Sequence, residues 1–447
     1  MAAMNGKSDD TLLKTPDTDT EYPPQERATS TYMPHPTYRL PKGDERHYQQ
    51  QYADMYFARL VQLKPAVEQI AREPFDAIEI GGEQCRRVER VLDVRQGELC
   101  WVIGTIYMEM PLKPNVLEDI GKEHWIAAPP PRVKYDSGAG LAVEGAHGAH
   151  AAGTGGAGTQ IMLEDESGRL RLVGSELGGF MLVTGAIVAV VGTENKDGDF
   201  EVLDLRVPDL PRQPQRWETE DGEAALKGEK VATQDREKAG KLALVSGLGI
   251  SGDEGDSLTL DLLLEYLLGE AATPKEQETA AGISRLIIAG NALSQSSPIP
   301  TPTTPKASDE VGWLDSQTNP ADLSVDGWRL LGNGGQPLDD VYKYIPNCEN
   351  RLDMMEAMLR WRLTAPTAPD TLWCYPFQDG DAFVMKECPH LFFVGNQPKF
   401  ETTVIEGPVG QQVRLVAVPN FKDTGEVVLI DMETLVPEVI KFDVFEG

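Results

Sequence analysis

Two stretches of the sequence join an apolar strand to a glycine-rich turn, an arrangement that many phosphate- and metal-binding sites use. The first is Leu242-Ala-Leu-Val-Ser-Gly-Leu-Gly-Ile-Ser251, and the second is Leu286-Ile-Ile-Ala-Gly-Asn291. In an open α/β sheet, ligand sites lie just beyond the carboxyl ends of such strands. Neither stretch contains a G-x-x-x-x-G-K-[ST] loop or leads into a G-x-G-x-x-G turn, so both are weak signals for nucleotide binding.

Together with Phe393-Val-Gly-Asn-Gln-Pro398, these turns resemble the metallophosphoesterase (calcineurin-like) superfamily. That superfamily holds two metal ions with Asp-x-His, Gly-Asp, Gly-Asn-His-Asp/Glu and Gly-His-x-His motifs at strand ends, and hydrolysis requires the ions to activate a water and neutralise the phosphate. No Gly-Asn-His-Asp/Glu motif occurs in this chain. The resemblance implies that the remaining ligand positions are degenerate, being occupied by Gly247, Gly249, Asn291, Asn396 and Pro398.

The distribution of histidines leads to the same conclusion independently of the family. Residues 151–389 contain no histidine, and the region after residue 240 contains only His390. A dinuclear site of imidazoles and carboxylates cannot be assembled from that set. For His390 a hydrogen-bonded structural role is favoured over metal ligation with Cys374 and Cys388. We therefore expect no catalytic residue, no cofactor and no metal site.

The elements expected to carry these turns alternate between strand and helix after residue 240, an α/β pattern. Proline, serine and threonine dominate residues 295–325, which offer no convincing element, and such a stretch counts against a complete domain. The expected strands are Leu242–Ser246, Arg285–Ala289, Gly327–Leu331, Leu391–Val394, Gln412–Val418 and Val427–Ile430, with helices at Leu258–Leu268 and Arg351–Arg362.

The first half of the chain combines one amphipathic helix with a small barrel. Apolar residues recur at helical spacing from Tyr52 to Ile70, and Pro65 should kink this helix or start a second one. A helix-compatible stretch near Pro114–Ile120 accompanies five short strands, a set typical of an OB-fold. The expected strands are Cys85–Leu92, Glu98–Tyr107, Arg169–Val173, Met181–Val191 and Phe200–Pro208.

The predicted fold class is therefore α+β and multidomain, with an N-terminal helix, an OB-fold β-barrel and an α/β metallophosphoesterase-like sandwich. Residues 1–42 are polar and predict a disordered tail. The Gly/Ala-rich stretch 138–160, which contains His147 and His150, predicts a flexible solvated insert, with weak metal binding as the lesser alternative. The remaining boundaries are a helical segment at 43–76, the barrel at 77–212, a linker at 213–240 and the sandwich at 241–447.

Composition restricts the partners. The formal charge is −30, from 71 acidic and 41 basic residues among 447, which disfavours autonomous tight binding to nucleic acid and favours basic protein partners. Five scattered cysteines without a C-x-x-C pair indicate neither a zinc ribbon nor a disulfide framework. We see no apolar run long enough to span a bilayer and no signal-peptide pattern, so the cytosol or nucleus is expected.

An OB-like barrel followed by a degenerate phosphoesterase domain resembles the B-type (small) subunits of eukaryotic replicative DNA polymerases. Several sequence blocks are most similar to those of polymerase delta, and their order and combination are specific although each alone is weak. The blocks are residues 46–56, Met110–Pro114, Val245–Gly249, Ala365–Thr371 with Cys374–Phe377, and Cys388–Asn396.

The resemblance implies a non-catalytic scaffold subunit of a DNA polymerase complex, acting in the nucleus in DNA replication and repair. Its expected partners are the C-terminal domain of the catalytic subunit and a third, extended subunit, with DNA contacted only indirectly or weakly and no membrane contact. The family also places further helices, a strand and a turn after Asn291 that this chain lacks. We therefore expect the strand at Gly327–Leu331 to miss a neighbour in its sheet.

Two alternatives belong to other classes of protein. The barrel could bind single-stranded DNA, with Trp101, Tyr107 and Phe180 stacking on bases and Arg86, Arg87 and Arg90 lining a groove, although core use of the aromatics is favoured. The second domain could retain a metal-dependent phosphoesterase activity, which the missing ligands disfavour.

Overall fold

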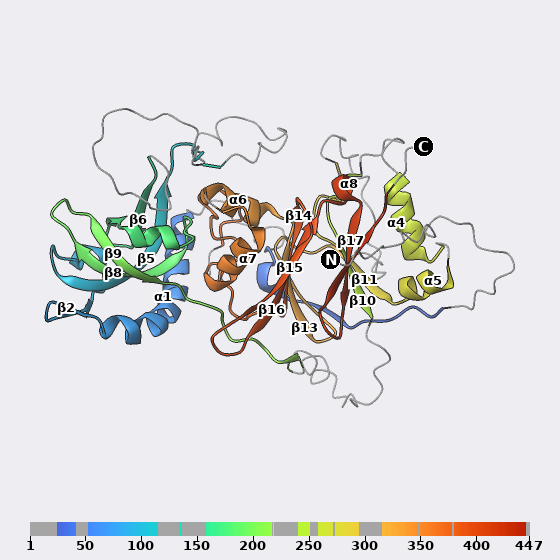
Figure 1. The fold of residues 1–447 in the computed structure, drawn as a ribbon, viewed down its shortest axis with the longest axis horizontal. Coiled ribbons are helices and arrows are strands. Elements are labelled where there is room, and N and C mark those ends of the chain that lie inside the picture. Colours follow the sequence, from blue (N-terminus) through green and yellow to red (C-terminus); the bar gives the residue numbers. More distant parts are fainter. Residues whose placement is uncertain are drawn as a thin grey trace, which may run out of the picture.

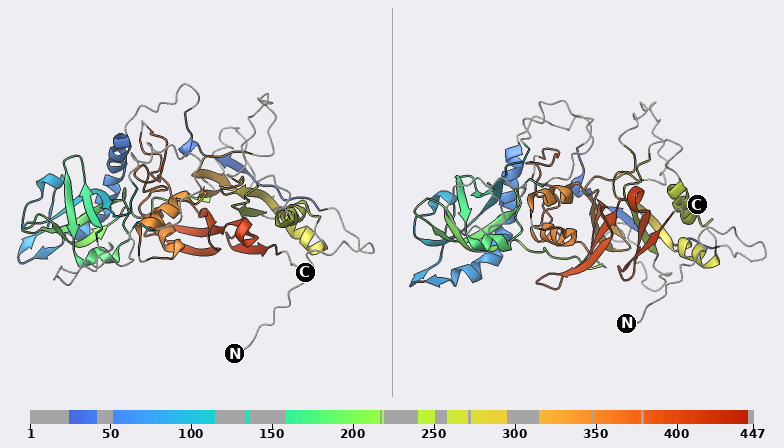
Figure 2. Two further views of the ribbon diagram at one scale, coloured as in Figure 1. Left: turned by 90° about the horizontal axis from the view of Figure 1, so that it is seen from above. Right: turned by 45° about the horizontal axis from the view of Figure 1, so that its top comes forward.

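A computed structural model gives the fold of the chain and describes residues 25–41, 52–114, 134–135, 158–216, 218, 240–250, 258–270, 273–294, 315–346, 348–377 and 380–443. Figures 1 and 2 show an elongated molecule with a β-barrel at one end and two packed sheets at the other. Within the described ranges, no helix combines the length and apolar character needed to cross a membrane. The expected helix near residues 114–120 and the insert at 138–160 lie almost entirely outside the described residues.

The barrel confirms the expected OB-fold class. Its sheet has the order β4-β5-β6-β7-β9-β8, and β5 also pairs with β8, which closes five strands into a ring. The expected strand Cys85–Leu92 is wrong, because only β4 is paired there and Val91–Asp93 form a 3-10 turn. The strands are β4 Arg86–Arg87, β5 Leu99–Glu109, β6 Gln160–Glu164, β7 Arg169–Val173, β8 Ile187–Glu194 and β9 Phe200–Arg206, beside a short hairpin of β2 Glu79–Ile80 and β3 Glu83–Gln84.

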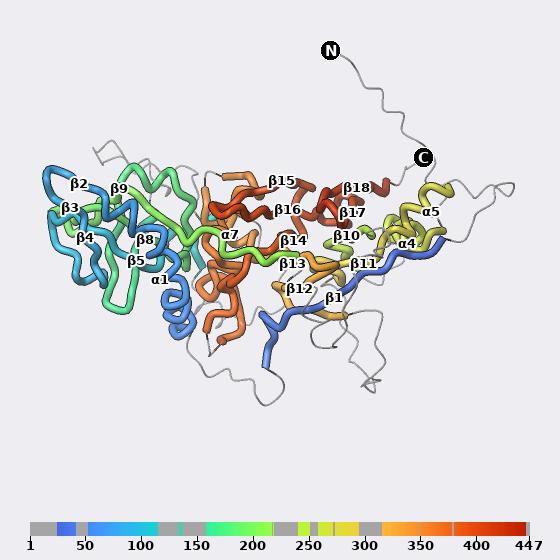
Figure 3. The backbone as a smooth tube through the Cα atoms, turned by 90° about the horizontal axis from the view of Figure 1, so that it is seen from below, coloured from blue at the N-terminus to red at the C-terminus, as the bar shows by residue number. Residues whose placement is uncertain are grey.

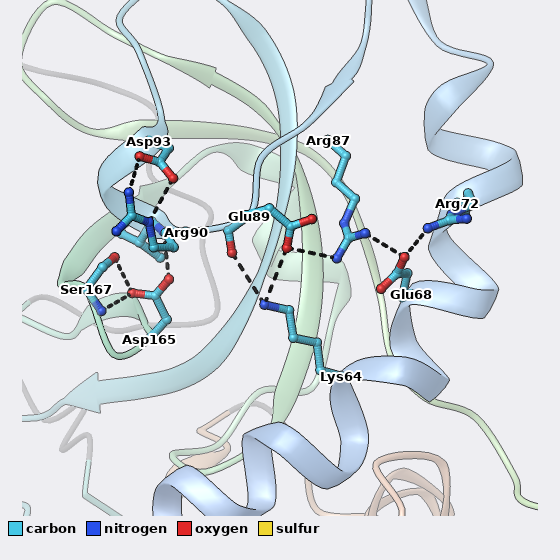
Figure 4. A network of polar contacts seen from close by, with 10 residues as sticks. Lys64, Glu68, Arg72, Arg87, Glu89, Arg90, Asp93, Asp165 and Ser167 are labelled. Atoms are coloured by element: carbon cyan, nitrogen blue, oxygen red, sulfur yellow. Dashed lines mark hydrogen bonds and ion pairs between the residues drawn. The ribbon is translucent and has the colours of Figure 1, made fainter.

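Helix α1, Tyr52–Asp76, packs its apolar stripe on the barrel. Val67, Ala71 and Phe75 are fully buried among the residues of the barrel core. Figure 4 shows the helix axis turning between Lys64 and Glu68, next to Pro65, as expected for a proline that removes a backbone hydrogen bond.

The second domain is a sandwich of two sheets with helices on its outer faces. Leucine, valine and isoleucine side chains of both sheets form the apolar layer between them. The six-stranded sheet has the order β1-β12-β13-β14-β16-β15, from β1 Tyr32–Pro34, β12 Ala321–Val325, β13 Trp328–Asn333, β14 Leu391–Gln397, β16 Gln412–Pro419 and β15 Glu401–Glu406. The four-stranded sheet has the order β11-β10-β17-β18, from β11 Ile283–Ile288, β10 Lys241–Val245, β17 Glu426–Asp431 and β18 Pro437–Lys441.

The helices complete the outer layers of the sandwich. Helices α4 (Leu258–Leu268) and α5 (Pro274–Ala281) share an apolar cluster with β10 and β17 of the four-stranded sheet. Helices α6 (Gln336–Tyr344) and α7 (Arg351–Arg360) lie on the six-stranded sheet, and their buried residues join the barrel and α1 in one continuous core. The short helix α8 (Phe421–Thr424) follows β16. The barrel and the sandwich therefore share apolar contacts.

Two expectations about missing or disordered structure are wrong. Residues 32–34 of the expected disordered tail form β1, which pairs with β12, and Figure 3 shows this N-terminal segment running alongside β12. The strand expected at Gly327–Leu331, observed as β13, is hydrogen-bonded to β12 on one side and β14 on the other. Strand β12 itself lies within the stretch 295–325 that the sequence presents as irregular.

The polar residues of the N-terminal segment explain this docking. His35 Nε2 hydrogen-bonds Ser324 Oγ at 2.8 Å, and the hydroxyl of Thr37 donates to Asp322 Oδ2 at 2.7 Å. Tyr38, in the 3-10 turn Pro36–Tyr38, is buried and stacks on Phe383. Composition alone did not reveal these long-range partners.

Candidate functional site

The turns at the carboxyl ends of β10, β11 and β13 meet the end of β14. The backbone N–H of Gly247 donates to Gly290 O at 3.0 Å, which joins the first two turns. A Cβ atom added to Gly290 would lie 2.9 Å from Gly334 Cα and 3.2 Å from Asn396 Nδ2. The strand ends are therefore in close contact.

Asn396 occupies the middle of this junction and is only 4% exposed. Its amide nitrogen donates to Gly334 O at 2.8 Å and to Ala289 O at 3.3 Å, and its backbone N–H donates to Ser246 Oγ at 2.8 Å. Asn396 lies on β14 of the six-stranded sheet, whereas Ala289 and Ser246 follow strands of the four-stranded sheet. The N–H donors of Asn396 therefore connect the two sheets by hydrogen bonds.

Gly247 and Gly249 have positive φ angles of 66° and 57°, a region that glycine adopts without strain. A Cβ atom at Gly247 would lie 2.5 Å from the side chain of Asn420, so an aspartate does not fit there unless that neighbour moves. The N–H of Gly249 donates to Asn291 O at 3.0 Å. The first two turns therefore meet through their backbones, whereas Pro398 is exposed beyond the end of β14.

Two polar residues at this junction were missed by the sequence reasoning. Ser246 is fully buried and its hydroxyl donates to Pro419 O at 2.9 Å while accepting from the backbone of Asn396. Asn420 fills the space beside Gly247 and caps the short helix α8. The only available signal was position, since each follows an apolar strand directly.

No group of three or more histidine, cysteine, aspartate or glutamate side chains within the described ranges could hold a metal ion. His390 lies instead at the start of β14, where its Nδ1 accepts a hydrogen bond from the backbone N–H of Arg329 at 3.0 Å. Burial lowers the pKa of His390 to about 4. Burial also raises the pKa of the Cys374 and Cys388 thiols to about 12. The hydrogen bond from Arg329 holds the imidazole of His390 in place at the start of this strand.

The three aromatic side chains considered for stacking on bases, Trp101, Tyr107 and Phe180, are all buried or partly buried in the structure. Trp101 is fully buried, packs edge-on against Phe75 at 5.9 Å between ring centroids, and donates from Nε1 to Asp76 Oδ1 at 2.8 Å. Tyr107 is partly buried, and its ring lies between two cations. Lys113 Nζ is 4.2 Å and Arg169 Cζ is 4.8 Å from the ring centroid. Phe180 is half-buried against the barrel core.

The three arginines proposed to line a nucleic-acid groove are paired with acids. Arg86 contacts Glu98 at 2.7 Å, and Figure 4 shows the pairs of Arg87 and Arg90. Arg87 contacts Glu68 at 2.6 Å and Glu89 at 3.3 Å. Arg90 makes two hydrogen bonds to Asp93, at 2.9 and 3.0 Å. Since each cation is compensated locally, this surface carries little net positive charge to attract a phosphate backbone.

The comparison with known proteins connects both domains to one family. A family model described as the DNA polymerase delta subunit OB-fold domain matches residues 51–205. A second model, which describes the B-type subunit of DNA polymerases alpha and epsilon, matches residues 296–402. The first match joins α1 to the barrel, in agreement with their packing.

Curated relatives cover nearly the whole chain. The DNA polymerase delta small subunit of Saccharomyces cerevisiae is 30% identical over 476 aligned residues, 90% of this chain and 91% of the relative. The DNA polymerase delta small subunit of Arabidopsis thaliana is 31% identical, and the alignment covers 88% of this chain and 91% of the relative. DNA polymerase delta subunit 2 of Drosophila melanogaster is 28% identical, and the alignment covers 89% of this chain and 94% of the relative. The yeast alignment is longer than the 447 residues of this chain, so the yeast protein contains residues that this chain lacks.

The closed five-stranded barrel agrees with the OB-fold domain that the first family model describes. The sequence identity to the curated relatives extends over about nine-tenths of the chain and so includes the two-sheet sandwich as well. This chain belongs to the family of DNA polymerase delta small subunits.

Proposed function

We propose that this protein is a non-catalytic assembly subunit of the DNA polymerase delta complex, acting in DNA replication and repair in the nucleus. It binds the C-terminal domain of the catalytic subunit and a third, extended subunit, and DNA synthesis belongs to the catalytic partner. The observation that carries the non-catalytic part is the position of Asn396. Its amide donates to two carbonyl oxygens at the strand ends, where a metal-dependent relative would need ligands with free lone pairs.

The degenerate positions Gly247, Gly249, Asn291, Asn396 and Pro398 offer no imidazole or carboxylate. Hydrolysis in this superfamily depends on metal ions that activate water, so the domain serves as a scaffold rather than an enzyme. Purified protein should not hydrolyse bis(p-nitrophenyl) phosphate or single-stranded DNA with manganese or magnesium. Turnover that follows the protein peak, disappears with EDTA and returns with metal would contradict this part of the proposal.

A single-strand binding role for the barrel is the second candidate, and the structure gives it less support. The buried Trp101 and the acid-paired Arg87 and Arg90 leave neither a stacking platform nor an uncompensated basic groove. Salt-sensitive binding of labelled oligo(dT) by the isolated chain, measured by fluorescence anisotropy, would revive this candidate.

We also propose that a segment present in relatives is absent between Ser294 and Asp326, and that its place is beside β11 rather than β13. Strand β11 is an edge of the four-stranded sheet, whereas β13 has both neighbours. Leu286 and Ile288, two positions apart on one face of β11, are 40% and 37% exposed. The proposed division of the chain places the barrel at residues 77–212, a linker at 213–240 and the sandwich at 241–447.

A further inference from the structure

The edges of the sandwich domain differ in how they are protected against pairing with another chain. Strand β1 covers the edge at β12. Strand β15 begins and ends with glutamate, and β18 begins with Pro437 and contains Glu438 and Lys441. Proline and charged residues on an edge strand oppose such pairing. Strand β11, Ile-Ser-Arg-Leu-Ile-Ile, has no proline and pairs with β10 alone among the residues that the structure describes.

The ladder between β10 and β11 shows which backbone groups of β11 face the open edge. The two strands are parallel, and the N–H of Ala289 donates to Val245 O at 2.7 Å. Backbone groups of successive residues in a strand point to opposite sides, so those of Leu286 and Ile288 point away from β10. Two N–H groups and two C=O groups are therefore directed at the edge, where another strand would pair.

The side chains of the same two residues form an apolar surface at this edge. In the ladder, Leu286 lies beside Ala243 and Ile288 beside Val245, and both β10 residues belong to the apolar cluster under α4 and α5. Ala243 and Val245 are fully buried, whereas Leu286 and Ile288 are 40% and 37% exposed. The apolar outer face of the sheet therefore continues past the helices to the open edge.

The one cation of β11 lies on the opposite face of the strand. Arg285 is beside Leu242, whose side chain lies in the apolar layer between the two sheets. Its Nε donates to Ser30 Oγ at 3.2 Å, and its guanidinium lies 4.4 Å from the ring centroid of Tyr32. The N-terminal segment thus holds Arg285 away from the outer face, which leaves that face of the edge apolar.

We propose that two copies of this chain form a dimer by antiparallel pairing of their β11 edges, centred on Ile287. In this register Leu286 of each copy faces Ile288 of the other, and the outward backbone groups of both residues exchange hydrogen bonds across a two-fold axis. Arg285 faces Ala289, so like charges do not oppose each other in the ladder. This self-complementarity argues for a second copy as the occupant, and the proposal does not depend on the proposed function.

The net charge of the chain opposes this dimer. Two chains that each have a formal charge of −30 repel each other, and salt screens that repulsion over roughly 8 Å at physiological ionic strength. One strand from each copy also makes a small interface. We therefore expect a dissociation constant on the order of 10–100 µM, which should fall severalfold as salt is raised from about 0.05 M to about 0.5 M.

Sedimentation velocity of the full chain, over about a hundredfold range of concentration, measures the dissociation constant. Wild type is compared with Leu286→Lys and Ile288→Glu, each of which places a charge opposite an apolar residue in the proposed register. The matched controls are Val439→Lys and Val439→Glu on β18, the other edge of the same sheet, because they change the net charge equally and Val439 is 38% exposed. Melting temperatures establish that every variant is folded.

We expect each β11 variant to raise the dissociation constant by about tenfold or more relative to its β18 control. An equimolar mixture of Leu286→Lys and Ile288→Glu chains should recover the dimer, because lysine then faces glutamate across the axis. A mixture of Leu286→Lys and Leu286→Glu chains should recover less, since position 286 does not face itself.

Three results would overturn the proposal. Wild type that stays monomeric at the highest concentration would show that the edges do not pair. A dimer that the β11 and β18 variants weaken equally, or that neither weakens, would place the contact elsewhere. A dimer that the mixture of Leu286→Lys and Ile288→Glu chains fails to recover would show that the proposed register is wrong.

Discussion

Arg59 is fully buried at the point where α1, the barrel and the sandwich domain meet. Its Nε donates to Asp381 Oδ2 at 2.5 Å, and its guanidinium also donates to Pro366 O at 2.5 Å, Ala368 O at 2.7 Å and Gly185 O at 3.4 Å. Gly185 belongs to the barrel and the other three partners to the sandwich domain. We predict that Arg59→Met loosens this junction and destabilises the protein more than any single exposed charge does.

The magnitude follows from the groups that the substitution leaves behind. Asp381 is 2% exposed, and removing one partner of a buried ion pair destabilises a protein by about 3–5 kcal/mol. Each buried carbonyl left without a donor adds about 1–3 kcal/mol where no water replaces the guanidinium. A loss of about 4 kcal/mol or more is therefore expected, a large share of the roughly 5–15 kcal/mol that stabilises a typical domain.

Urea unfolding followed by tryptophan fluorescence and circular dichroism measures this loss. The double variant Arg59→Met/Asp381→Asn should recover part of it, because the amide carries no uncompensated charge. Arg72→Met is the matched control, since Arg72 pairs with Glu68 one turn away but is 60% exposed and should change stability by less than about 1 kcal/mol. A loss below about 1 kcal/mol for Arg59→Met would refute the reasoning.

Three further predictions concern the strand ends, the buried histidine and the open edge. Asn396→Asp replaces an amide donor with a carboxylate that faces Gly334 O and Ala289 O, so it should destabilise the protein by about 2–4 kcal/mol at pH 7. The loss should be smaller at low pH, where a protonated carboxyl group can donate a hydrogen bond. A thermal melt at pH 7 that shows the stability of the wild type would contradict this prediction. His390 has a folded pKa of about 4 against an unfolded value near 6.5, so the unfolded state takes up the proton first and stability should fall as pH drops from 6.5 towards 4, by up to about 3 kcal/mol. His390→Asn keeps an acceptor for Arg329 and should flatten that dependence in urea titrations; an unchanged slope would show that other groups cause it. Leu286→Lys on the edge strand β11 should change the free energy of unfolding by less than about 1 kcal/mol, because Leu286 is exposed. The added charge should also reduce aggregation on heating, measured by light scattering. Severe destabilisation would mean that another part of the protein covers this edge.

Elements with a strong local pattern were predictable from the sequence. The helix Leu258–Leu268 and the strand Arg169–Val173 have the bounds that apolar spacing and turn residues indicate. The strand expected at Cys85–Leu92 failed because its polar residues turn away into local ion pairs, such as Arg90 with Asp93, and only two residues remain in the ladder. The local sequence pattern does not determine which of several short segments will pair with a neighbouring strand of the sheet.

Elements that depend on distant partners were not predictable. Strand β12 contains Asp322 and Ser324, both buried, and neither residue type favours a strand. They are stabilised by Thr37 and His35 of the N-terminal segment, almost 290 positions earlier in the chain. The same applies to Asn396, which the sequence analysis predicted as a degenerate ligand position and not as an amide that hydrogen-bonds to both sheets.

The central claim is that this chain is an assembly subunit of polymerase delta, and the most direct test is its thermal melt with and without the catalytic subunit's C-terminal domain. A partner that binds only the folded state stabilises it by mass action, by about 2.7 kcal/mol at a concentration one hundred times the dissociation constant. We predict a melting temperature that rises with partner concentration, together with a stoichiometric complex in size-exclusion chromatography. An unchanged melting temperature at saturating partner, with two separate elution peaks, would contradict the claim.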